Sequence, residues 1–144
     1  MIENIIINNL EKYKNDIEKI NTTKNIDCIT IFSISEEDYE ILNIEMQKCG
    51  YIIDNMSSGN LYYIEDGITT IYGKLHFIKI RKYDKNYLEY RISVDFTVQD
   101  YEVFKKSINI PIIKVYDTFE LIQLKNENSI INIISLSAKD DYKL

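Results

Sequence analysis

Glycine and proline are scarce in this sequence, with four glycines and one proline among 144 residues. That scarcity disfavours long flexible linkers and loop-rich folds, and it excludes a glycine-rich phosphate-binding loop. Tryptophan is absent, and histidine occurs once, as His76. A histidine-based metal site or a nucleophile paired with histidine therefore has almost no residues to draw on. We predict a function that uses neither a metal nor another cofactor.

Cysteine is also rare, and long hydrophobic runs are missing. Cys28 and Cys49 stand in apolar surroundings without CxxC spacing, which predicts two buried, reduced thiols, with a disulfide between them as the alternative. No apolar run approaches the roughly 20 residues that span a bilayer. Residues 5–7 are too short for the core of a signal peptide. These absences favour a soluble, cytoplasmic protein.

The charge balance is acidic, with a formal net charge of −6. This disfavours a protein that binds nucleic acid or anionic membranes in general, because such binding needs clustered lysine and arginine. One basic cluster does occur over residues 79–91, with tyrosines between the basic residues. Within an acidic chain we interpret it as a solvated hairpin or a patch for an acidic protein partner. The length fits a single domain.

The first 21 residues carry an amphipathic pattern. Apolar side chains recur at spacings of four, three, four and three residues, which predicts a helix over residues 2–21 that packs on the rest of the domain. A narrow stripe of this kind also suits a second copy, so a homodimer through this helix is the alternative. The stripe consists of Ile6, Leu10, Tyr13, Ile17 and Ile20.

A short motif occurs twice. Asp-Tyr-Glu followed by two apolar residues begins at residues 38 and 100, which are 62 positions apart. A run rich in β-branched residues precedes each copy, over residues 26–34 and 90–98, and further strand-like segments follow. The pattern predicts one unit used twice, in the order strand, helix and three strands.

Two βαβββ modules in tandem resemble the vicinal oxygen chelate superfamily, which includes glyoxalases and bleomycin-resistance proteins. The modules would occupy residues 26–84 and 85–144, behind the helix and connector of residues 1–25, and the tail 139–144 is expected to fray. The resemblance implies an α+β fold with a curved, mixed or antiparallel sheet and a cleft on its concave face.

In metal-dependent members of that superfamily, His, Gln or Glu side chains on the first and last strands of each module hold a divalent ion. Here the first strands contain neither His nor Glu, and the position 56 residues after His76 is Asn132. We therefore expect a cleft that binds its ligand without a metal.

Four residues are candidates for that cleft. His76 shares a strand face with two isoleucines, so it is either a hydrogen-bonded core histidine or a ligand contact at the cleft floor. Arg91 and Asp95 lie on the polar side of the strand 90–98, which the resemblance turns towards the cleft; a solvent-facing strand is the alternative. Glu120, between two apolar residues of a later strand, is a further candidate.

Three functions stay open at this point. The preferred one is binding of a small anionic or amphipathic ligand in the cleft, with no enzymatic activity required. The second is an adaptor that docks on other proteins through the helix of residues 2–21 or the basic hairpin. The third is a cofactor-free isomerase or lyase with His76 as general base.

Overall fold

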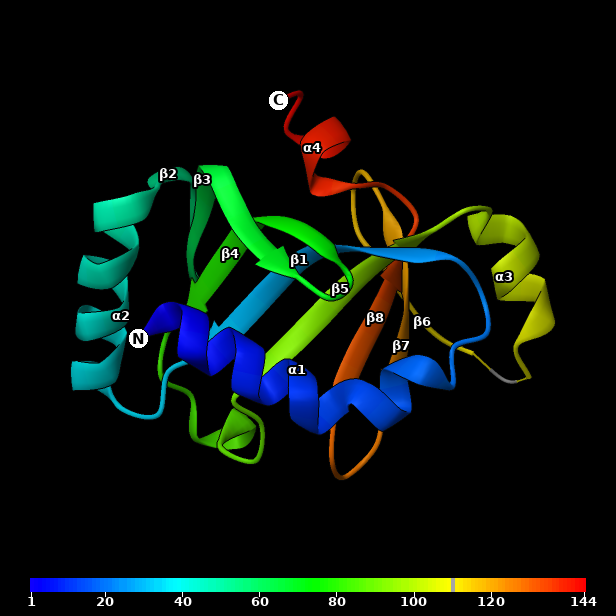
Figure 1. The fold of residues 1–144 in the computed structure, drawn as a ribbon, viewed down its shortest axis with the longest axis horizontal. Coiled ribbons are helices and arrows are strands. Elements are labelled where there is room, and N and C mark those ends of the chain that lie inside the picture. Colours follow the sequence, from blue (N-terminus) through cyan, green and yellow to red (C-terminus); the bar gives the residue numbers. More distant parts are fainter. Residues whose placement is uncertain (110) are drawn as a thin grey trace.

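The computed structural model describes residues 1–109 and 111–144. Within these ranges the protein has an α+β fold, which confirms the predicted class (Figure 1). The elements in chain order are α1 (Ile2–Glu18), β1 (Lys24–Phe32), α2 (Glu36–Cys49), β2 (Tyr51–Met56), β3 (Gly59–Thr70), β4 (Gly73–Arg81), the 3-10 helix η1 (Lys85–Tyr87), β5 (Ile92–Val98), α3 (Tyr101–Ser107), β6 (Ile112–Val115), β7 (Glu120–Lys125), β8 (Ile130–Ile134) and α4 (Ala138–Asp141).

The strands form a mixed, open sheet in the order β2-β3-β4-β1-β5-β8-β7-β6. β1 pairs in parallel with β4, and β5 pairs in parallel with β8. The two halves of the chain meet where β1 and β5 pair in antiparallel fashion, with Ile29 opposite Val94. Each half therefore places its first strand at the centre, beside its own last strand, and leaves its second strand at an edge of the sheet.

Helix α1 lies across one face of this sheet, with α2 towards one end and α3 towards the other (Figure 1). All five side chains of its predicted apolar stripe, Ile6 to Ile20, are buried. They pack against sheet residues such as Ile29, Ile78 and Val94 in one core. The Tyr13 hydroxyl donates a 2.7 Å hydrogen bond to the backbone carbonyl of Ile92. The stripe is thus used inside the chain, and none of the described helices is long and apolar enough to cross a membrane.

The repeated motif stands at the start of both α2 and α3, but in different helical positions. Helix α2 is capped by Ser35, whose hydroxyl accepts from the Asp38 amide, so Asp38 already belongs to the first turn. In α3 the corresponding residue, Asp100, is itself the cap and accepts from the Val103 amide. The motif therefore lies at the start of both helices, but its aspartate occupies a different position relative to the helix cap in each.

Helix α2 leads directly into β2 through Gly50, whose backbone is extended, with φ −153° and ψ −173°. Two local predictions were wrong. Cys28 is buried but Cys49 is exposed, since the last turn of α2 faces solvent there; both thiols are free. The tail does not fray, because the Ala138 amide donates to Asp27 at 3.0 Å and the Tyr142 hydroxyl donates to Asp54 at 2.6 Å.

Candidate functional site

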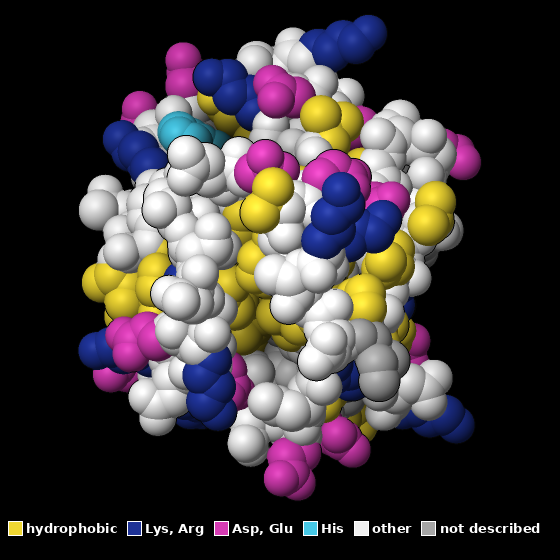
Figure 2. All heavy atoms as spheres, turned by 90° about the vertical axis from the view of Figure 1, so that its right-hand side faces the viewer, with side chains coloured by type: hydrophobic (Ala, Val, Ile, Leu, Met, Phe, Trp, Pro, Cys, Tyr) yellow, Lys and Arg dark blue, Asp and Glu magenta, His cyan; other side chains and the backbone are white. Residues whose placement is uncertain are grey.

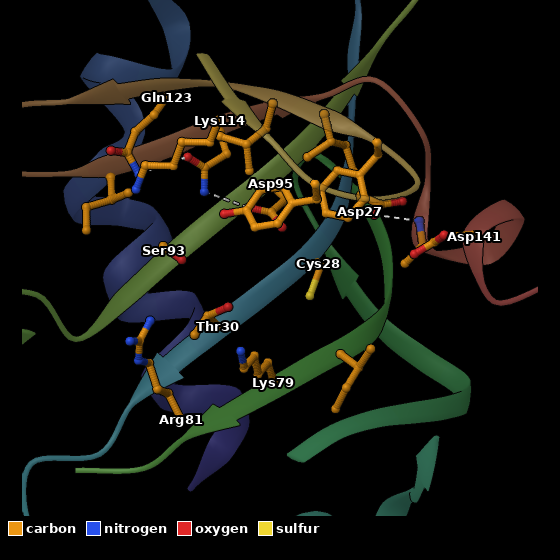
Figure 3. Close-up of a pocket in the computed structure, with 18 of the residues that line it drawn as sticks. Asp27, Cys28, Thr30, Lys79, Arg81, Ser93, Asp95, Lys114, Gln123 and Asp141 are labelled. Atoms are coloured by element: carbon orange, nitrogen blue, oxygen red, sulfur yellow. Dashed lines mark hydrogen bonds between the residues drawn. The ribbon is translucent and has the colours of Figure 1, made fainter. Parts of the chain in front are cut away.

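A cavity of about 360 Å³ opens on the face of the sheet opposite α1 (Figure 3). Because side chains alternate along a strand, the isoleucines of β1 and β4 point towards α1 while the residues between them point into this cavity. We refer to it as the sheet cavity. The C-terminal segment forms one of its walls, through Ala138, Asp141 and Tyr142.

Strand register places the polar side chains of the cavity in two rows. Thr30 on β1 is opposite Lys79 on β4 and Ser93 on β5. Two positions away, Cys28 is opposite Asp95, which is in turn opposite Asn132 on β8. Paired positions share a face of the sheet, so each row brings together side chains from strands far apart in the sequence.

A β-bulge adds one more acidic group. The pairing of β1 with β5 shifts between Ile26 and Cys28, which leaves Asp27 as an extra residue in β1. Both Asp27 and Cys28 consequently reach the cavity wall. Burial raises the pKa of Asp27 to about 6, against the opposing hydrogen bond from the Ala138 amide.

Asp95 is the central acidic group of the cavity. The side-chain amide of Asn132 donates to its carboxylate at 2.9 Å, and Gln123 lies 3.5 Å from the Asn132 side-chain oxygen. Burial raises the pKa of Asp95 to about 7; the hydrogen bond from Asn132 opposes the rise and the neighbouring Asp27 adds to it. Near neutral pH this carboxyl therefore exists in both protonation states and can either donate or accept a proton.

The other end of the cavity is basic. The guanidinium carbon of Arg81 lies 4.1 Å from the centre of the Tyr87 ring, and Tyr87 stacks on Phe32 with centroids 5.2 Å apart. The ion pairs formed by the described residues include neither Arg81 nor Lys79. Lys79 donates instead to the Ser58 hydroxyl at 2.7 Å, and burial lowers its pKa. A guanidinium held by aromatic rings and unopposed by a carboxylate is suited to an anion.

Of the four residues proposed from the sequence, Asp95 lies in the cavity wall and the other three lie elsewhere. Nδ1 of His76 is 2.8 Å from the carbonyl oxygen of Ile64, so Nδ1 carries the hydrogen. Arg91 forms an ion pair with Asp38 at 2.7 Å. Glu120 accepts hydrogen bonds from Tyr101 and Lys105, both at 2.8 Å.

The sequence reasoning did not select Arg81, Lys79, Thr30 or Ser93 for the cavity. The sequence did contain a pattern that points to two of them. Lys79 and Arg81 alternate with the isoleucines of β4 and so share one face of that strand. What was missing was the parallel pairing of β4 with β1, which brings that face next to Asp95. Unless the order of the strands is known, the polar face of an alternating strand cannot be assigned either to a cleft or to solvent.

The donor set does not fit a divalent metal. Across residues 1–109 and 111–144, no group of three or more His, Cys, Asp or Glu side chains is arranged to hold a metal ion. Asp95 and Asp27 share the cavity with the Cys28 thiol, whose pKa burial raises.

No protein-family model matches the chain, and no curated protein matches it by sequence. Its fold is similar to that of a solved structure described as "Structural Genomics, Protein EC4020". That similarity has a TM-score of 0.66 and covers 93% of this chain and 87% of the other, at 11% sequence identity. At this identity the likeness shows the fold alone.

Proposed function

We propose that the protein binds a small anionic, amphipathic molecule in the sheet cavity, without a metal. The observation that carries the proposal is Arg81, a cation in the cavity wall that is stacked on Tyr87 and has no ion-pair partner among the described residues. The remaining wall is largely apolar and suits a hydrocarbon body. Its apolar members include Met56, Leu61, Phe119, Leu121, Ile134 and Leu136.

The scaffold proposed for this function is a duplicated βαβββ module of the vicinal oxygen chelate kind. Two observations support it: both halves have the element order strand, helix, three strands, and both have the same strand order within the sheet. The cavity lies across the junction of the two halves, where residues of β1 and β4 meet residues of β5 and β8. Such a junction is a common place for ligand sites in folds built from two halves.

Calorimetric titration with hexanoate and benzoate tests the proposal, with hexanol as the uncharged probe. The wild-type protein should bind an anionic probe more tightly than hexanol. Arg81→Gln should weaken binding of the anion by about tenfold or more, as expected for the loss of a charge-assisted hydrogen bond. Lys74→Gln removes a charge from an exposed position of the same strand and should leave binding unchanged. Absence of binding by both anions, or equal binding by wild type and Arg81→Gln, would refute the proposal.

A protein-interaction function has support from a different surface. Strand β6 is an edge strand and exposes apolar side chains, with Val115 77% and Ile112 57% accessible. Figure 2 shows the side of the molecule on which α3 lies in Figure 1, with hydrophobic side chains among charged ones. An edge of this kind can pair with a strand of a second copy. If it does, sedimentation should show a concentration-dependent dimer that Val115→Lys abolishes; a monomer at all concentrations would refute it.

The other two hypotheses have less support. Docking through the apolar stripe of α1 would require residues such as Leu10 and Ile17 that are buried against the sheet. An isomerase or lyase with His76 as general base would require this side chain in the cavity, and His76 is not part of its wall.

A further inference from the structure

The charges of the sheet cavity are sorted along the direction of its strands (Figure 3). Asp27 and Asp95 lie towards one end and Arg81 towards the other, with Thr30, Ser93 and Lys79 between them. Asp95 is opposite Cys28 in the sheet, and Arg81 is opposite Phe32, four residues further along β1. At about 3.3 Å per residue the two ends lie roughly 13 Å apart along the backbone. A bound molecule therefore meets opposite charges at its two ends.

No ion pair formed by the described residues neutralises the acidic end. Asp95 and Asp27 each accept one hydrogen bond from an uncharged amide, from Asn132 and from the Ala138 backbone respectively. Neither takes part in the ion pairs formed by the described residues. Two buried carboxyl groups in one cavity without an ion-pair partner are costly to ionise, and an ammonium group from a ligand would reduce that cost.

The two lysines of the cavity wall, Lys79 and Lys114, form no ion pair with these carboxyl groups. Lys79 belongs to the Thr30 row, two residues from the Asp95 row, and its amine donates to Ser58 at 2.7 Å. Besides Lys79, the middle row presents the hydroxyls of Thr30 and Ser93, and the Cys28 thiol stays protonated because burial raises its pKa. Apolar side chains such as Leu61 and Leu121 flank this middle section. The middle of the cavity therefore suits a spacer of methylene groups.

Building on the proposed function, we propose that the ligand is dipolar, with its anionic group at Arg81 and a protonated amine at Asp95 and Asp27. An α-amino acid carries both charges on one carbon atom and is too short for this separation. An ω-amino acid or a similarly elongated zwitterion has the required geometry. The anionic end and the apolar body follow from the proposed function, and the ammonium end is the new element.

Three probes of the same length separate the two ends of the ligand. Hexanoate carries only the anion, hexylamine only the cation, and 6-aminohexanoate carries both. Titrations are carried out at pH 8, where Asp95 and Asp27 are largely ionised. The wild-type protein should bind 6-aminohexanoate about tenfold more tightly than hexanoate, as a charge-assisted hydrogen bond to a carboxylate provides.

Two variants test whether Asp95 provides the tighter binding of 6-aminohexanoate. Asp95→Asn should reduce the preference for 6-aminohexanoate over hexanoate towards unity while hexanoate binding persists. Glu40→Gln, which neutralises an exposed carboxylate on α2, should retain the preference. Equal binding of hexanoate and 6-aminohexanoate by the wild type would overturn the dipolar ligand and leave the anion site standing. Failure of every anionic probe to bind would overturn both proposals, and neither result depends on whether a variant folds.

Discussion

Asn132 and Asp95 lie opposite each other on β8 and β5, and the amide of Asn132 donates a 2.9 Å hydrogen bond to the Asp95 carboxylate. This bond favours the ionised carboxyl, yet burial outweighs it and raises the pKa to about 7. The titratable groups around Asp95 are Asp27 and Cys28 on β1 and Lys79 on β4. Of these, Asp27 strengthens the rise and Lys79 weakens it.

The raised pKa of Asp95 predicts a specific pH dependence of stability. The folded protein keeps this proton up to about pH 7, whereas the unfolded chain releases it near pH 4, so the free energy of unfolding falls as the pH rises through that window. Asp95→Asn removes this loss. The variant should gain about 2 kcal/mol over wild type at pH 8, after allowance for water in the cavity, and little at pH 4.

Urea unfolding at the two pH values measures this difference. Glu40→Gln, on the exposed side of α2, should follow the wild type at both values. The same change in stability at pH 4 and pH 8 for Asp95→Asn would contradict a titrating buried carboxyl.

We predict that Arg91 stabilises the fold and does not contribute to ligand binding. Its guanidinium bonds Asp38 at 2.7 Å and the carbonyl oxygen of Phe32 at 2.8 Å, which ties the start of α2 to the central strands. Arg91→Ala should lower the free energy of unfolding by about 2 kcal/mol at pH 7 and leave the affinity for hexanoate unchanged. Lys82→Ala, at an exposed position directly after β4, should change neither quantity.

The same ion pair has its own pH dependence. Burial acts to raise the pKa of Asp38, but the hydrogen bonds from Arg91 and from the Ile34 amide hold it below its ordinary value. The contribution of the pair is therefore present above about pH 4 and is lost as the pH falls through the lower pKa of the folded state. An Arg91→Ala variant of normal stability that fails to bind hexanoate would instead make Arg91 a ligand contact.

Two tyrosines provide a matched test of buried hydrogen bonds. The Tyr13 hydroxyl donates to Ile92, and burial raises the pKa of Tyr13 to about 12. The Tyr72 hydroxyl is buried and has no hydrogen-bond partner among the described residues. Tyr13→Phe should cost about 1 kcal/mol of stability, whereas Tyr72→Phe should be neutral or stabilising by a similar amount. Thermal unfolding of both variants measures the contrast, and equal losses would contradict it.

The two cysteines should react at very different rates. Cys49 is exposed, although partial burial and nearby Glu3 and Glu45 raise its pKa, whereas Cys28 is buried. A thiol reagent at pH 8 should modify one cysteine per native chain quickly and both after denaturation. Cys49→Ser should abolish the fast reaction. Fast labelling that persists in Cys49→Ser would show that Cys28 is accessible through the cavity.

Part of the fold and one residue of the site could be predicted from local pattern. The apolar stripe of α1 and the position of Asp95 on the polar side of β5 both follow from periodicity along a single element. His76, Arg91 and Glu120 were chosen by the same kind of argument, but each has its polar atoms engaged by a residue distant in sequence. The type of a residue and the strand face on which it lies do not show which distant residue will form a hydrogen bond or an ion pair with it.

The sequence by itself determined the α+β class, the buried face of α1 and the alternation of the strands, because these depend on backbone geometry within a few residues. Only the tertiary structure decided that β1 lies between β4 and β5, which sets Arg81 and Asp95 at opposite ends of one cavity. It also decided that the C-terminal segment closes a wall through Ala138 and Tyr142. Strand neighbours and docked termini depend on the packing of the whole chain, which no local pattern records.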